Sequence, residues 1–178
     1  DLLNFYLIRA HPTILVGQSA ATTLLLAITS RTGLVTFHGP SVIQHFGDIE
    51  GPDQSTVANL LAVLQGDAVE YRAAASYSDA YQDWDFSDAP RPYQPGTPWR
   101  RLRPGIARGP LLGGSLRALV RNLESDHPVD FGGAIAFWDL AYPAGSLPDP
   151  EEAPRLLTAL GRTGVLGSIA GLLAGKPY

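Results

Sequence analysis

The order strand, helix, strand within residues 13–40 is the feature that most constrains the fold. A short apolar run over 13–17 ends at a glycine. The next residues, 20–31, have the pattern of a helix that Gly33 closes. The stretch LVTFHGP, residues 34–40, is a second short strand that runs into a Gly-Pro turn. Because the helix lies between the two strands, this segment predicts a parallel βαβ unit and an α/β fold.

Further elements are predicted before and after this unit. Residues 1–9 have leucines at helical spacing, and this helix should end before the His11-Pro12 pair. A helix over 55–66 should begin with Ser55 as N-cap and end at Gly66. The C-terminal part predicts a strand, glycine turn and helix over 105–123, a buried strand within 132–142, a helix over 151–160, a short helical turn, and a strand beginning near Leu172.

Composition excludes several classes of protein and site. With 45% hydrophobic and 17% charged residues, the 178-residue chain can form a globular core. The net charge of −4 argues against a nucleic-acid partner, which normally requires a basic surface. No apolar run is long enough to cross a bilayer, so we expect no membrane partner. The absence of cysteine excludes disulfides, thiolate catalysis and thiolate metal sites.

Residues 76–104 differ in composition from the rest of the chain. They are rich in proline, aromatic and charged residues, and no hydrophobic period continues through them, so they predict a linker or a surface excursion. Tyr81, Trp84 and Trp99 could line a ligand groove, or they could hold an irregular segment against the core. The second interpretation is favoured.

Ser19 occupies the corner between the first strand and the first helix of the βαβ unit. The segment Gly17-Gln18-Ser19-Ala20-Ala21 resembles the nucleophile-elbow pattern G-x-S-x-G, with alanine in the last small position. Such a sharp turn exposes the hydroxyl and crowds the residues two before and two after it, which must therefore be small. The free amides of a helix that starts at Ala20 could stabilise an oxyanion. Alternatively, Ser19 only caps the helix.

Several longer segments resemble the LD-carboxypeptidase family of serine peptidases, which includes the microcin C immunity peptidases. They run from HPTILVGQSAATTLLLAITSRTGLVTFHGP through GPLLGGSLRAL and GGAIAFWDLAY to LLTALGRTGVLGSIAGLLAGKPY, in the family's order. The resemblance implies an α/β fold with a partial class I glutamine amidotransferase-like N-terminal domain over 1–75, a linker over 76–104, and part of a mixed α/β C-terminal domain over 105–178.

The resemblance also implies a Ser-His-Glu triad, with Ser19 as nucleophile and Asp139 on or next to the triad glutamate. Either carboxylate can orient a histidine, although aspartate is one methylene shorter. Alternatively, Asp139 caps a nearby turn. The Ala20 amide would contribute to the oxyanion hole. We expect the triad histidine downstream of residue 178, and the glycine-rich oxyanion loop upstream of Asp1, in a chain trimmed at both ends.

The chain departs from the family pattern at three positions that bear on the site. Gln18 replaces a tyrosine, Ala20 an aspartate, and Ser115 the asparagine of the glycine turn. The turn formed by Gly113, Gly114 and Ser115 could hold a substrate carboxylate on bare amides, or it could allow close packing, which we favour.

None of the four histidines stands out as a substitute base: His38 is expected to fix its own turn, and His11, His45 and His127 to lie in exposed or loop positions. No histidines and acidic residues have metal-ligand spacing, so we expect no metal, and the family chemistry requires no organic cofactor.

The resemblance implies a serine carboxypeptidase-like hydrolase that cleaves an L,D amide bond in murein peptides or a related conjugate. The alternative is an inactive homologue that binds peptides or pairs with another chain, which the departures and the missing histidine favour. By resemblance, the partner is a small peptide substrate, and a homodimer in the cytoplasm is expected.

Overall fold

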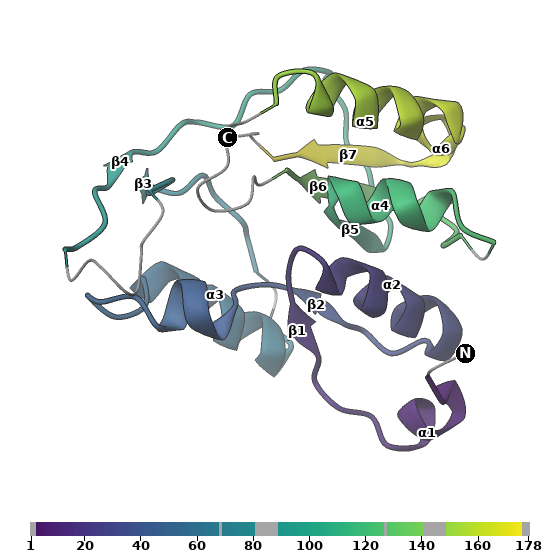
Figure 1. The fold of residues 1–178 in the computed structure, drawn as a ribbon, viewed down its shortest axis with the longest axis horizontal. Coiled ribbons are helices and arrows are strands. Elements are labelled where there is room, and N and C mark those ends of the chain that lie inside the picture. The colour runs from purple at the N-terminus through teal and green to yellow at the C-terminus, as the bar shows by residue number, and fades with distance from the viewer. Residues whose placement is uncertain (1–2, 68, 81–88, 127, 141–148, 176–178) are drawn as a thin grey trace. The chain divides into compact units, whose positions relative to one another are not determined.

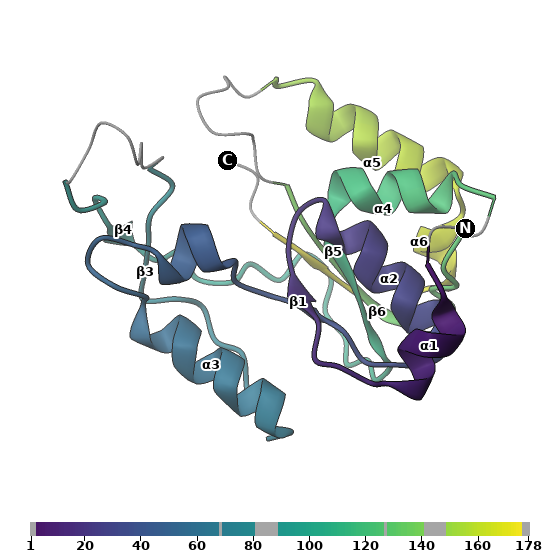
Figure 2. The ribbon, with the colours of Figure 1, turned by 60° about the horizontal axis from the view of Figure 1, so that its bottom comes forward.

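A computed structural model describes residues 3–67, 69–80, 89–126, 128–140 and 149–175 (Figures 1 and 2). The chain divides into two compact units, Asp1–Gly39 with Ile106–Tyr178, and Pro40–Gly105. These limits differ from the predicted 1–75, 76–104 and 105–178, because the N-terminal βαβ unit packs against elements of the C-terminal part. As domain boundaries of the family fold, the predicted limits stay a prediction.

The predicted parallel βαβ unit is confirmed in the first compact unit. Strand β1 (Val16–Gly17), helix α2 (Ala21–Thr32) and strand β2 (Phe37–His38) follow one another, and the two strands pair in parallel. Gly33, with a positive φ, ends α2 as expected. The preceding helix α1 (Phe5–Ala10) begins at Asn4, whose side chain accepts a hydrogen bond from the Leu7 amide.

A second, three-stranded parallel sheet completes this unit. Its order is β5 (Leu111–Ser115), β6 (Ile135–Asp139) and β7 (Gly171–Ala174). Helix α4 (Leu116–Leu123) connects β5 to β6, and helices α5 (Glu152–Arg162) and α6 (Val165–Ser168) precede β7. Helices α4 and α5 lie side by side over the sheet (Figures 1 and 2). The mixed α/β fold with parallel sheets is therefore confirmed.

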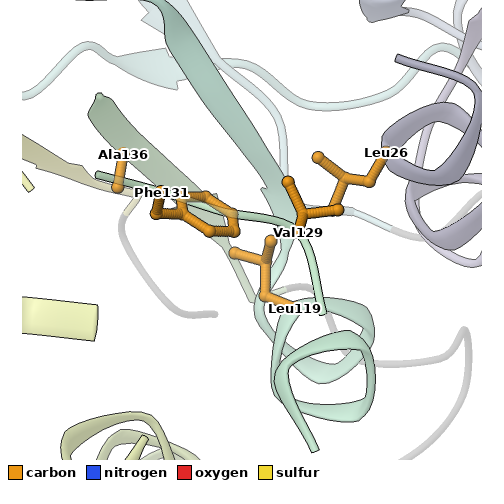
Figure 3. Packing of buried hydrophobic residues seen from close by; sticks show 5 residues of the cluster. All are labelled: Leu26, Leu119, Val129, Phe131 and Ala136. Atoms are coloured by element: carbon orange, nitrogen blue, oxygen red, sulfur yellow. The ribbon is translucent and has the colours of Figure 1, made fainter. Parts of the chain in front are cut away.

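Apolar side chains hold the βαβ unit against this sheet. Leu26 of α2, Leu119 of α4 and Ala136 of β6 lie in one buried cluster with Val129 and Phe131 (Figure 3). Helix α4 forms because its apolar residues recur at i, i+3 and i+4, which gives it one buried face. The cluster fixes α2 relative to β5 and β6, and with it the corner that carries Ser19.

The second compact unit contains a π-helix η1 (Val42–Phe46), helix α3 (Gln54–Gln65) and a short antiparallel pair, β3 (Ser76–Tyr77) and β4 (Gln94–Pro95). The prediction that Ser55 caps α3 is wrong: Asp53 is the N-cap, and its carboxylate accepts from the Thr56 amide. The cap therefore lies two residues before the predicted one, and the helix begins at Gln54.

The proline- and aromatic-rich segment belongs to this second unit and carries β4. Arg91 ties it to the η1 region through an ion pair with Asp48. Trp99 is 62% exposed, so for this residue the expected packing against a core is wrong. Tyr81 and Trp84 lie outside the described residues.

Candidate active site

Steric crowding shapes the corner before α2. A methyl group built on Gly17 would lie 2.8 Å from the Cβ of Ala21, closer than two carbon atoms can approach. Gly17 and Ala21, two residues before and two residues after Ser19, therefore touch each other across the turn. This is the physical reason for the small residues that the sequence showed there, and it confirms a sharp strand-to-helix turn.

Ser19 itself has the conformation and exposure of a residue presented to a ligand. Its φ is +53°, and it is the only non-glycine residue with positive φ in the described part of the chain. That backbone costs about 1–2 kcal/mol for an L-residue. The side chain is exposed and bonds to no described residue. The alternative that Ser19 caps α2 is wrong, because Ala20 occupies the N-cap position and no side chain caps the helix.

The backbone amide of Ala20 is available beside this hydroxyl. The next two amides, of Ala21 and Thr22, donate to the carbonyl oxygens of Gln18 and Ser19. The Ala20 amide donates to no acceptor among the described residues. It can therefore donate to an oxygen that gains negative charge next to Ser19.

Asp139 is the last residue of β6, the strand end predicted for it. Its Oδ2 lies 2.9 Å from Nε2 of His38, at the end of β2, and its side chain is 46% exposed. His38 also packs against the ring of Phe137. The expectation that His38 fixes its own turn agrees with this bond. Asp139 anchors that turn, and its Oδ1 contacts no described partner.

The Gly113-Gly114-Ser115 segment is built for close packing. A Cβ on Gly114 would lie 2.4 Å from Thr22 of α2, and the Ser115 amide donates to the Thr22 hydroxyl over 3.0 Å. Gly113 and Gly114 lie within β5, opposite Phe137 and Trp138 of β6. The favoured interpretation of the turn is therefore supported. The Ser115 amide is occupied, and only the side chain of Ser115 remains for a substrate.

A series of contacts links the carboxyl ends of β1, β2, β5 and β6, which pair in parallel as β1–β2 and β5–β6. Gly17 pairs with His38, His38 bonds to Asp139, and Asp139 pairs with Ser115. Ser115 and Ser19 line the same surface hollow, so this series of contacts leads back to the corner after β1. Ligand sites of α/β folds commonly lie at the carboxyl ends of parallel strands.

The hollow has a volume of about 130 Å³. It lies between the start of α2 and the exposed side of α4, and its lining residues are Ser19, Ala20, Thr23, Ser115, Arg117, Ala118 and Arg121. Its only charged lining residues are the two arginines. Arg117 forms a two-bond ion pair with Glu152, with distances of 2.5 and 2.6 Å. This hydrogen bonding holds the pKa of Glu152 below its usual value, against a smaller opposing effect of burial.

Arg117 and Arg121 were not among the site residues predicted from the sequence. The signal was present: the two arginines are four residues apart in the helix that follows the glycine turn, so they share one face of that helix. Of the other histidines, His11 is exposed, His45 belongs to the second compact unit, and His127 lies outside the described residues. Burial, with the nearby Arg91 charge, lowers the pKa of His45.

Within residues 3–67, 69–80, 89–126, 128–140 and 149–175, no three histidine, aspartate or glutamate side chains gather in a way that could hold a metal. In the same part of the chain, no helix has the length and apolar character needed to cross a membrane.

Residues 1–39 match the family described as the LD-carboxypeptidase N-terminal domain, peptidase S66. The chain is 33% identical over 175 residues to the probable murein peptide carboxypeptidase of Bacillus subtilis. The match covers 96% of the chain and 45% of that protein. It is 26% identical over 180 residues to the microcin C7 self-immunity protein MccF of Escherichia coli. That match covers 98% of the chain and 51% of MccF.

The fold also resembles that of MccF-like proteins. The crystal structure of an MccF-like protein from Bacillus anthracis superposes with a TM-score of 0.82 at 23% identity, covering 99% of the chain and 52% of that protein. The chain thus spans about half the length of the relatives that it matches.

Proposed function

Because the chain belongs to the LD-carboxypeptidase family, we propose that it forms the nucleophile-bearing part of a serine carboxypeptidase that cleaves an L,D amide bond in murein peptides. One observation carries the proposal. Ser19 has a strained positive φ at an exposed strand-to-helix corner, with the free Ala20 amide beside it. Strain of this kind persists where the fold imposes it, and it concentrates at active sites.

The proposed reaction begins when Ser19 Oγ attacks the carbonyl carbon of the L,D amide. Its proton passes to a histidine, which the family resemblance implies after residue 178. The Ala20 N–H stabilises the resulting oxyanion. Collapse breaks the C–N bond, and the histidine returns the proton to the leaving amine of the D-amino acid. Water then hydrolyses the ester on Ser19 by the same proton transfers.

Asp139 holds the catalytic histidine in this scheme. Its Oδ2 is engaged by His38, while Oδ1 has no partner among the described residues and the side chain is partly exposed, so Oδ1 can accept from a further donor. A carboxylate fixed by one histidine keeps the orientation in which it can accept the Nδ1 or Nε2 proton of another. His38 acts here as a positioning residue.

The test is a comparison of the protein, expressed from its complete reading frame, with its Ser19→Ala variant. We expect the protein to release the terminal D-amino acid from an L,D-linked murein tetrapeptide. The variant should lose activity by at least about 10³-fold, because the covalent step disappears. Ser30→Ala, which removes an exposed hydroxyl near the other end of α2, is the matched control and should retain turnover. Equal turnover by the protein and Ser19→Ala would overturn the proposal.

A peptide-binding homologue without activity is the second candidate. The observation that favours it is the engagement of Asp139 by His38 within the chain itself. An inactive peptide-binding protein should bind the tetrapeptide with the same affinity as its Ser19→Ala variant, and neither should release a product. Calorimetric titration together with the turnover assay separates the two functions.

Three finer proposals rest on family resemblance alone. We propose that the N-terminal part is class I glutamine amidotransferase-like, that the protein is a homodimer, and that it acts in the cytoplasm. Glutamyl sulfamoyl guanosine, with which MccF forms a complex in a solved structure, is a second compound to assay. Analytical ultracentrifugation and cell fractionation test the assembly and the location.

A further inference from the structure

From the basic hollow beside Ser19 we infer that Arg121 is a specificity-determining residue, which binds the free terminal carboxylate of the substrate. The inference rests on the proposed function and names the group that the same site recognises. A carboxypeptidase must hold the terminal carboxylate close to the scissile bond. The hollow lies directly against the proposed nucleophile and the proposed oxyanion donor, so a group bound there is close to the reacting carbonyl.

The two arginines of the hollow differ in the charge that they offer. Glu152 neutralises Arg117. The Arg117 Nε and Nη2 groups donate to the two carboxylate oxygens of Glu152. Arg121 forms no ion pair with any described acidic residue, and its side chain is exposed. The net positive charge of the hollow is therefore the charge of Arg121.

The spacing of the two arginines is unfavourable for the helix that carries them. Arg117 and Arg121 are four residues apart on α4, and like charges at that spacing destabilise a helix by about 0.2–0.5 kcal/mol. The Glu152 pair relieves part of the repulsion. A bound anion would relieve the rest, and it would be held by a planar guanidinium whose geometry matches a carboxylate.

The neighbouring groups suit a small anion. The amide of Ser115, which could have held a carboxylate, already donates to Thr22. Side chains must therefore supply recognition, and the hydroxyls of Thr23 and Ser115 line the hollow with the arginines. A volume of about 130 Å³ corresponds to only about four water molecules at the density of the liquid. It suits a carboxylate with a small side chain.

The experiment compares two substrates: the L,D-linked tetrapeptide with a free C-terminal carboxylate, and the same peptide as its C-terminal amide. For the protein we expect kcat/KM to favour the free acid. Arg121→Gln should raise KM for the free acid about 10- to 100-fold, the loss of one charge-assisted pair, and leave the amide substrate unchanged. Arg121→Lys should recover part of the discrimination, because it keeps the charge without the fork.

Arg162→Gln is the matched control, since Arg162 is likewise an exposed arginine in the last turn of its helix, α5. Both variants lose the same favourable interaction with a helix C-terminus, so their unfolding midpoints should agree. Only Arg121→Gln should change the ratio between the two peptides. If Arg121→Gln leaves that ratio unchanged, or if the protein cleaves acid and amide equally, the inference is wrong.

A binding measurement separates this inference from the proposed function. Calorimetry on Ser19→Ala, with and without Arg121→Gln, measures affinity for both peptides in the absence of turnover. Preference for the acid that disappears with Arg121→Gln supports the carboxylate site even if Ser19 proves not to be the nucleophile. Turnover that depends on Ser19 but is indifferent to Arg121 overturns the inference and leaves the proposed function intact.

Discussion

His38 and Asp139, 101 residues apart in the chain, are joined by a hydrogen bond of 2.9 Å between Nε2 and Oδ2. His38 Nδ1 is buried and has no partner among the described residues, so the geometry assigns the ring proton to Nε2, which donates to the carboxylate. The bond connects the turn after β2 with the end of β6. Both sheets of the first compact unit therefore contribute to the edge at which Ser19 lies.

Asp139→Asn should impair the proposed hydrolysis by about 10³-fold or more, because an amide cannot stabilise the imidazolium that forms during the reaction. The measurement is kcat on the murein tetrapeptide. Asp139→Glu is the matched variant: it keeps the carboxylate and restores the residue of the family motif, so it should stay within about tenfold of the protein. Full activity of Asp139→Asn would remove this residue from the mechanism.

Gly17→Ala should destabilise the protein by about 1–3 kcal/mol, because the new methyl group meets Ala21 at 2.8 Å and the turn must open. Urea unfolding measures the change. Gly161→Ala on α5, where a Cβ meets open space, should instead stabilise by about 0.5 kcal/mol.

Ala21→Gly combined with Gly17→Ala should recover part of the loss, since it removes the opposing methyl group. A Gly17→Ala protein as stable as the original would show that the corner is not crowded.

Thr22→Val should cost about 1–3 kcal/mol of stability. Valine matches threonine in shape but leaves the buried Ser115 amide without an acceptor. Hydrogen exchange of that amide should accelerate in the variant. Thr23→Val, on the exposed side of the same helix, is the control and should change stability by less than about 0.5 kcal/mol. Equal effects of the two substitutions would contradict the assigned hydrogen bond.

The ion pair of Arg117 with Glu152 predicts a pH dependence. A carboxylate whose pKa is lowered in the folded state contributes stability above its unfolded pKa, and this contribution is lost as the pH falls through the folded pKa. Glu152→Gln should therefore be less stable than the protein at neutral pH, and the difference should shrink at acidic pH. Denaturant unfolding from pH 7 to pH 3 measures it, and a constant difference would argue against the pair.

Local patterns predicted much of the fold. The strand, helix and strand of residues 13–40, the amphipathic α4, and the end of β6 at Asp139 all followed from short-range spacing, because helix and strand periods and glycine stops act within a few residues. The cap of α3 was predicted wrongly, since Ser55 and Asp53 both suit a cap and only their geometry chooses between them. The compact units were not predicted, because they depend on contacts between distant segments.

The sequence by itself determined the corner: Gly17 and Ala21 are small enough for the tight turn at Ser19, in which these two positions touch each other. Only the tertiary structure decided which groups surround it. Burial of Leu26 against Leu119 brings α2 beside α4, and that packing sets Arg121 next to the serine. Apolar burial is non-directional and acts between residues of any separation, so no local pattern along the chain encodes which distant polar groups it brings together.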